Sequence, residues 1–166
     1  MPTGCTFRHQ SYKVNISGQE YALFDTVGFD EGTEGTVPAA QAKKGLNGLL
    51  AKLTSPVSDG IDLLVYCVQS TRARHALLRH YNHVYSTICR KKVPIVVVVT
   101  GLEDEPIMEN WWNTYGQEFE SLGMLFKDHA CVTTLVEDPG TPVDFIHRIA
   151  ESRKVLRNLI VKNCSE

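Results

Sequence analysis

Two short polar stretches, each following a run of apolar residues, hold the residue types most able to do chemistry in this chain. In "DTVG", Asp25 ends an apolar run and Gly28 follows three positions later. The second stretch, "TGLED", runs from Thr100 to Asp104 directly after four consecutive valines. A carboxylate at a strand end can hold Mg²⁺ or accept N–H groups, and glycine lets the backbone approach a phosphate closely. Together these features favour a site for a magnesium-bound phosphate.

Both stretches also have simpler interpretations. Asp and Gly are favoured in turns, so Asp25 to Gly28 could form only the turn after a strand. Asp104 could cap the helix expected after it, which is a common role for aspartate. The residues alone leave these alternatives open.

Alternating strands and helices position the two stretches. Apolar runs predict strands at residues 11–16, 20–24, 61–68, 94–99 and 130–133. Helical spacing predicts helices at residues 38–53, 72–90, 106–122 and 143–161. The first two strands are joined by "SGQE", which predicts an antiparallel hairpin. The remaining pattern is typical of parallel strands with right-handed crossovers in a three-layer α/β fold, where ligands bind beyond the carboxyl ends of the strands.

The composition is that of an ordinary globular protein, with 166 residues of which 43% are hydrophobic and 22% charged. This length suits a single domain, residues 1–166. A net charge of -2 argues against a nucleic-acid partner, and we expect no membrane span, since no apolar run is long enough to cross a bilayer. The five cysteines are odd in number and widely spaced with no CxxC pair, which argues against a disulfide scaffold or a zinc site. We therefore expect a reducing, cytoplasmic compartment. Cys67 and Cys131 lie inside apolar runs and are predicted to be buried thiols.

The order and spacing of these stretches resemble a known family. "DTVG" is similar to the DxxG element of GTP-binding domains, and "TGLED" is similar to their guanine-recognising NKxD element. The resemblance extends to "GCT" at residues 4–6 and "HACVTT" at residues 129–134. It covers residues 3–161 and is to P-loop GTPases of the translation-factor class, which include Ras-like, septin-like and immunity-associated proteins. Within that class the chain looks most similar to fungal G-domain proteins.

On the phosphate side, the resemblance implies GTP or GDP with Mg²⁺ as the ligand. Thr6 and Asp25 would hold the magnesium ion, and Gly28 would donate its backbone N–H to the terminal phosphate. Phe29 stands where Ras-like proteins carry a glutamine that orients water, which implies slow hydrolysis.

On the base side, the resemblance implies that Thr100, Asp104 and Thr133 contact the nucleotide. Asp104 would accept the N1–H and the exocyclic amine of guanine as a charge-assisted pair. Thr133 lies in a loop that would contact the base through backbone N–H groups. Gly101 and Leu102 stand where the family has asparagine and lysine, and Leu102 could replace the packing of the lysine stem but not its charge.

The chain contains no GxxxxGK[ST] motif, which is the phosphate cradle of this family. The resemblance therefore predicts a G-domain-like α/β sheet, mostly parallel with one antiparallel hairpin strand, that is N-terminally incomplete because it lacks the first strand, the phosphate loop and the first helix. Strands 21–25 and 61–68 would lose a shared neighbour, and they would pair directly, take an edge from a second chain, or belong to a longer protein.

We expect a GTP-binding protein with weak or lost nucleotide binding and hydrolysis. The alternative is a non-catalytic pseudo-GTPase that serves as a scaffold for a protein partner or for self-association. A different α/β enzyme is disfavoured, because the sequence has neither a nucleophile elbow nor a glycine fingerprint for dinucleotides.

Overall fold

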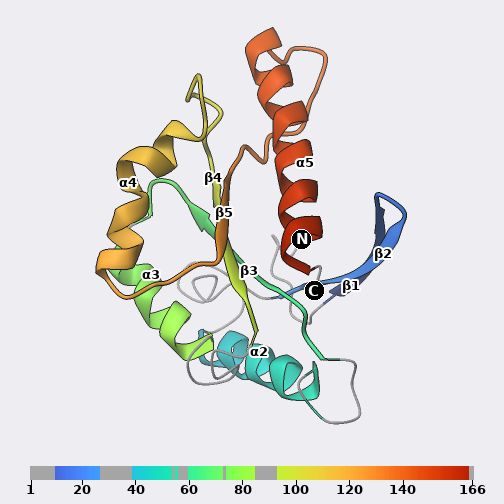
Figure 1. The fold of residues 1–166 in the computed structure, drawn as a ribbon, viewed down its shortest axis with the longest axis vertical. Coiled ribbons are helices and arrows are strands. Elements are labelled where there is room, and N and C mark those ends of the chain that lie inside the picture. The colour runs from blue at the N-terminus through green and yellow to red at the C-terminus, as the bar shows by residue number, and fades with distance from the viewer. Residues whose placement is uncertain are drawn as a thin grey trace. The chain divides into compact units, whose positions relative to one another are not determined.

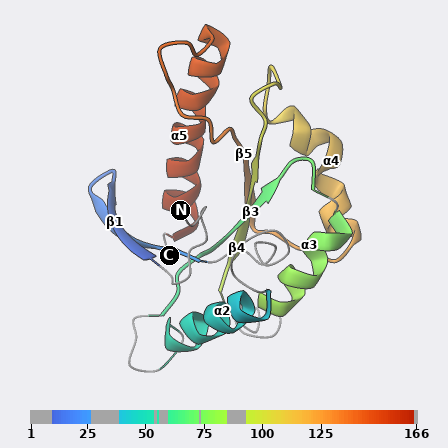
Figure 2. The ribbon, with the colours of Figure 1, turned by 180° about the vertical axis from the view of Figure 1, so that it is seen from behind.

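The computed structural model describes residues 10–26, 39–53, 55, 60–72, 74–84 and 93–164. The chain divides into two compact units, Met1–Ile61 and Asp62–Glu166. Figures 1 and 2 show the helices and strands of both units from opposite sides. The content is mixed α/β, as the sequence predicts.

The first unit contains the predicted β-hairpin. Strand β1 (Gln10–Ile16) pairs antiparallel with β2 (Gln19–Asp25). The connection is Ser17 and Gly18, with φ angles of 53° and 88°. Two positive φ values are what a type I′ turn needs, and this turn matches the twist of the flanking strands. The side-chain oxygen of Asn15 accepts the Gly18 N–H at 3.0 Å and closes the turn.

Helix α2 (Ala39–Leu53) completes the described part of the first unit. Its leucines at helical spacing, Leu46, Leu49 and Leu50, are buried. The helix therefore begins within one residue of the predicted start and ends at the predicted residue.

The second unit contains a parallel sheet of three strands in the order β3 (Leu64–Gln69), β4 (Ile95–Thr100) and β5 (Asp128–Cys131). Val97 of the central strand lies opposite Tyr66 and His129. Strand β5 begins two residues before the predicted strand. Within the described residues, the hairpin and this sheet are separate sheets.

Alternate residues of β4 face opposite helical layers. Ile95, Val97 and Val99 pack in one cluster with residues of α3 (Arg74–Tyr81) and α4 (Asn110–Ser121). Val96 and Val98 pack in a second cluster with Leu159 of α5 (Val143–Cys164). Figures 1 and 2 show α3 and α4 on one side of the sheet and α5 on the other. A central strand covered on both faces is continuously apolar, so the predicted three-layer arrangement is present in this unit.

Helix α5 (Val143–Cys164) is 22 residues long and covers one face of the sheet. Its apolar residues Val155, Leu156 and Leu159 face β4 and β5, while most of its exposed positions are charged. None of the described helices combines the length and the hydropathy that a bilayer crossing requires.

Strand β3 is less covered than the sequence predicts. Its residues Val65 and Cys67 are exposed, whereas Val68 is buried. The prediction that Cys67 is a buried thiol is therefore wrong, although Cys131 is buried as expected. The reason is tertiary, because the cluster beneath α5 is built on β4 and β5.

Some helix boundaries also differ from the prediction. Helix α3 ends at Tyr81, and residues 85–90 of the predicted helix lie outside the described residues. Helix α4 begins at Asn110 rather than 106, because the chain before it forms successive turns, one of which is closed by the Glu105 N–H donating to the Leu102 carbonyl at 3.1 Å. The N-cap position is Glu109, so the alternative role of Asp104 as a helix cap is wrong.

Candidate carboxyl-edge site

The loops that follow β3, β4 and β5 meet at the carboxyl edge of the parallel sheet. The Ser70 N–H donates to the Thr100 carbonyl at 3.0 Å, and the Leu102 N–H donates to the Val132 carbonyl at 3.3 Å. The Thr100 hydroxyl donates to the Val68 carbonyl at 3.3 Å. The loop after β4 and the start of α5 lie at the same end of the unit (Figure 1). This is the edge at which α/β sheets bind ligands.

Gly101 and Leu102, the two residues that differ from the NKxD pattern, have structural roles in the loop after β4. Gly101 has a φ of 83°, a left-handed conformation that disfavours residues with a Cβ by about 1–2 kcal/mol. Leu102 is 2% exposed and packs in the cluster beneath α3 and α4. Its side chain is part of the core and is not available to pack against a base.

Glu103 fastens the loop after β4 to the rest of the unit. The Thr133 hydroxyl donates to Oε2 of Glu103 at 3.0 Å, and Nη1 of Arg148 donates to the Glu103 carbonyl at 2.6 Å. The side chain is half-buried. No described residue donates a hydrogen bond to its Oε1. The carboxylate is thus held in place with one oxygen open.

Thr133, a predicted base contact, is buried at 4% exposure. Its N–H donates to Oγ of Ser152 at 3.0 Å, and its own Oγ1 accepts the Leu135 N–H at 3.2 Å. The next backbone N–H, that of Thr134, donates no hydrogen bond to any residue that the structure describes. If this loop contacts a base through backbone N–H groups, the N–H that is available belongs to Thr134.

Arg74 fastens the loop after β3. Its Nη1 donates to the carbonyls of Ser70 at 3.3 Å and Arg72 at 2.5 Å. The guanidinium lies 4.7 Å from the ring centroid of Trp111, a cation–π distance. Its Nε is 3.1 Å from Oε2 of Glu118, at ion-pair distance but without hydrogen-bond alignment. All three loops of the edge are therefore anchored to helices or to neighbouring strands.

The remaining predicted site residues stand apart from this network. Asp104 is exposed, and its carboxylate has no hydrogen bond or ion pair within the described part of the chain. Asp25 is exposed at the end of β2 in the first unit. Thr6 and Gly28 lie outside the described residues, so Asp25 alone represents the predicted phosphate side. Among the residues that the structure describes, no three His, Cys, Asp or Glu side chains gather as metal ligands would.

Sequence reasoning missed Arg148 and Ser152. They lie four residues apart on α5 and are linked by a bond from the Ser152 hydroxyl to the Arg148 carbonyl at 2.7 Å. Their partners at the edge are 45 and 19 residues away along the chain. No local pattern marks such contacts, because they depend on how α5 packs on the sheet.

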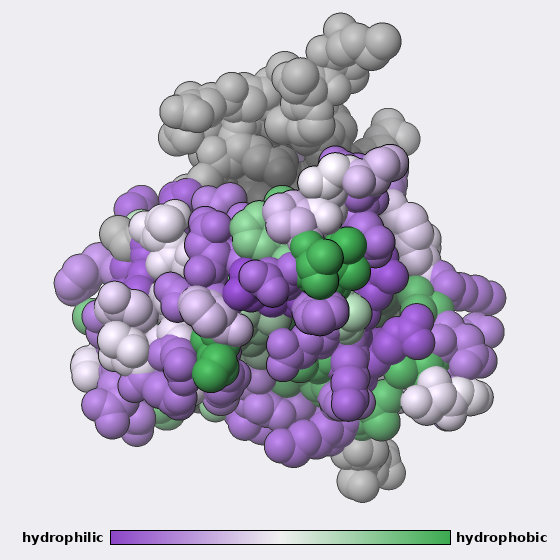
Figure 3. Space-filling model, turned by 90° about the horizontal axis from the view of Figure 1, so that it is seen from above, coloured by the Kyte–Doolittle hydropathy of each residue, from purple (hydrophilic) through white to green (hydrophobic). Residues whose placement is uncertain are grey.

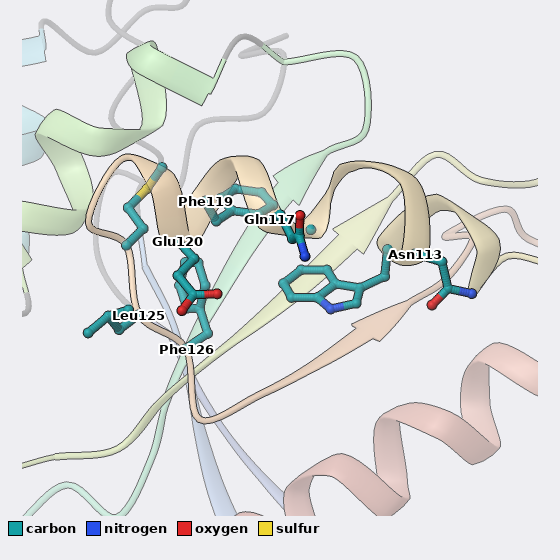
Figure 4. A pocket seen from close by; sticks show the side chains of 9 residues that line it. Asn113, Gln117, Phe119, Glu120, Leu125 and Phe126 are labelled. Atoms are coloured by element: carbon teal, nitrogen blue, oxygen red, sulfur yellow. The ribbon is translucent and has the colours of Figure 1, made fainter.

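A cavity of about 440 Å³ lies beside α4 (Figure 4), and no residue of the carboxyl-edge loops lines it. Its lining combines aromatic and apolar side chains with polar ones: Trp112, Asn113, Gly116, Gln117, Phe119, Glu120, Met124, Leu125 and Phe126. These residues belong to α4 and to the turn before β5. The cavity therefore does not include any of the predicted site residues.

Trp112, which lines this cavity, is tightly packed against its neighbours. Its ring lies parallel to that of His129, with centroids 4.0 Å apart, and His129 pairs with the carboxylate of Glu109. A Cβ on Gly116 would lie 2.7 Å from the indole. Burial, followed by the charge of Glu109, raises the pKa of Cys131 to about 12, so this thiol stays protonated at neutral pH. The "HACV" segment thus contributes packing rather than a reactive nucleophile.

No family model matches the chain, and no curated protein matches its sequence. The proposal of a function therefore depends on the geometry of the carboxyl edge and on the motifs that lead to it.

Proposed function

We propose that the second unit binds a guanine nucleotide at the carboxyl edge of its sheet, as part of a GTP-binding G domain whose nucleotide binding and hydrolysis are weak or lost. One observation carries this proposal. The loop after the central strand presents carboxylates at that edge and is held to the loop after β5 by the Thr133 to Glu103 hydrogen bond. A carboxylate can accept the N1–H and the 2-amino group of guanine together, and adenine offers no such pair of donors.

The residues at this edge fit a base better than they fit phosphates. Glu103 and Asp104 place negative charge on the loop, which attracts N–H donors and repels phosphate. The sequence contains no GxxxxGK[ST] motif to neutralise the phosphates. The family resemblance assigns the metal and the phosphates to Thr6, Asp25 and Gly28, of which the structure describes only Asp25, in the first unit. We therefore expect Kd values between about 10 µM and about 1 mM.

Isothermal titration calorimetry tests the proposal. GDP and GTP, each with and without Mg²⁺, should bind at least about tenfold more tightly than ADP, because adenine cannot satisfy a carboxylate at the base site. Wild-type binding weaker than about 1 mM for every guanine nucleotide would contradict the proposal. Equal affinities for GDP and ADP would contradict recognition of the base.

A non-catalytic interaction module is the second candidate. Apolar side chains near the same loops are exposed: Ile107, Leu135, Val136 and Val143. Seen from above, hydrophobic residues form small patches among predominantly hydrophilic ones (Figure 3). This candidate predicts no thermal shift with GDP and Mg²⁺, together with self-association in sedimentation velocity as the protein concentration rises. A monomer at all concentrations would contradict the self-association form of this candidate.

A further inference from the structure

We propose that Glu103, rather than its neighbour Asp104, is the carboxylate that recognises the guanine base, and that Thr133 positions it. This inference rests on the proposed guanine-nucleotide site. It changes the assignment within "TGLED", where the family resemblance places Asp104 in the recognition role.

Glu103 is ordered before any ligand arrives. Its carboxylate is held by the Thr133 hydroxyl at 3.0 Å, and its backbone carbonyl is held by Arg148 at 2.6 Å. Thr133 is itself fixed, because its N–H donates to the buried hydroxyl of Ser152. Ordering a glutamate side chain costs rotamer entropy. Here that cost falls on folding, so it does not oppose ligand binding.

Asp104 lacks these supports. Its side chain is exposed and has no hydrogen bond within the described residues. A ligand would have to order it at the moment of binding and would compete with bulk water for its oxygens. Charge-assisted hydrogen bonds are weaker at such sites, because the local dielectric is high.

The open positions on Glu103 match a donor pair. A carboxylate offers about four lone-pair positions over its two oxygens. The Thr133 hydroxyl takes one position on Oε2, and no described residue donates to Oε1. Both oxygens therefore keep capacity to accept the N1–H and the 2-amino group of guanine.

Comparing nucleotides that carry different bases shows whether Glu103 recognises the base or has only a structural role. Glu103→Gln keeps the shape of the side chain but replaces one acceptor by an NH₂ donor. That NH₂ group would face the 2-amino group of guanine, and two donors cannot form a hydrogen bond with each other. It can donate a hydrogen bond to the 2-carbonyl of xanthine. Asp104→Asn makes the same chemical change one residue away and serves as the matched control.

Calorimetry with GDP and xanthosine diphosphate gives the test. For Glu103→Gln we expect GDP affinity to fall about 10- to 100-fold and affinity for xanthosine diphosphate to rise above that of the wild type. For Asp104→Asn we expect less than about a threefold change with either nucleotide. Larger changes in Asp104→Asn would overturn the inference and leave the proposed function standing. No GDP binding by the wild type would overturn both.

A second pair of variants keeps the test decisive if Glu103→Gln folds poorly. Thr133→Val removes the hydroxyl that holds Glu103, and Thr133→Ser keeps it. GDP affinity should fall about fivefold or more in the valine variant and stay near the wild-type value in the serine variant. Equal GDP affinities in these two variants would overturn the positioning role of Thr133.

Discussion

Asp128 and Glu103 lie at opposite edges of the same parallel sheet, and their partners differ. Asp128 begins β5 at the amino edge. Its Oδ1 accepts the His129 N–H at 2.8 Å, and its Oδ2 accepts Nδ2 of Asn163 at 3.0 Å and lies 3.3 Å from Nζ of Lys162. Both oxygens are therefore engaged by the protein itself.

Glu103 at the carboxyl edge has only one engaged oxygen, on the Thr133 hydroxyl, within the described residues. A carboxylate whose two oxygens both accept hydrogen bonds from the protein stabilises the fold, because each hydrogen bond to a charged group contributes to stability. Such a carboxylate has no acceptor position left for a ligand. A carboxylate that is held in place but only partly satisfied keeps acceptor capacity for a ligand. We therefore propose that the amino edge serves stability and that the carboxyl edge binds the ligand.

The largest effect is expected from loosening the carboxyl edge. Ser152→Ala should lower the free energy of unfolding by about 1–3 kcal/mol, because the buried N–H of Thr133 loses its acceptor. GDP affinity should fall with it, since Thr133 would no longer be fixed. Urea unfolding and calorimetry measure the two effects. Ser121→Ala is the control, because the exposed Ser121 hydroxyl donates to the carbonyl four residues earlier, as Ser152 does, and it should change stability by less than about 0.5 kcal/mol.

A change at the amino edge should lower stability without lowering GDP affinity. Asp128→Asn should lower the free energy of unfolding by about 1 kcal/mol, because the charge facing Lys162 and Asn163 is lost. GDP affinity should not change. Asp62→Asn, which makes the same change at an exposed carboxylate just before β3, is the control. A weakened GDP affinity in Asp128→Asn, without the same effect in the control, would break the distinction between the two edges.

The pH dependence of stability sharpens the same contrast. Burial would raise the pKa of Asp128, but the bonds from Asn163, from the His129 N–H and from Lys162 outweigh it and lower that pKa below its ordinary value of 3.8. The unfolded chain then takes up this proton first as the pH falls. The stabilisation from Asp128 is thus complete above about pH 3.8 and is lost at lower pH, as the carboxylate titrates through its lowered pKa. Acid unfolding should show a shallower pH dependence in Asp128→Asn, and an unchanged profile would contradict this assignment.

The smallest effect is expected at Asp104. Asp104→Ala should change the free energy of unfolding by less than about 0.5 kcal/mol, because the side chain is exposed and has no partner among the described residues. Thermal unfolding of the variant beside the wild type checks this. A larger loss would show that Asp104, like Glu103, belongs to the network that orders the edge.

The layers of the second unit could be predicted from the sequence because their causes are local. Val96 to Val99 are continuously apolar because both faces of β4 are covered. In the first unit, the Ser17-Gly18 turn likewise follows from its residue types. The amino-acid pattern also located the carboxyl edge through Thr100 and Asp104. It could not show which carboxylate is ordered, because the partner of Glu103 lies 30 residues away and depends on how the strands pack.

The start of α4 was mispredicted for a related reason. Pro106 and the acidic residues before it suit the first turn of a helix. In the structure, Leu102 and Met108 are both buried in the same cluster. The chain between them forms turns, and the helix begins only at Asn110. Tertiary burial outweighed local helix preference at this position.

The central claim is that guanine nucleotide binds at the carboxyl edge of the second unit. The most direct test is a map of backbone amide shifts in ¹⁵N-labelled wild-type protein titrated with GDP. We expect the largest shifts at residues 101–105 and 133–135, with little change at Asp128 and Asn163. Shifts concentrated on the cavity beside α4, or no shifts at millimolar GDP, would contradict the claim.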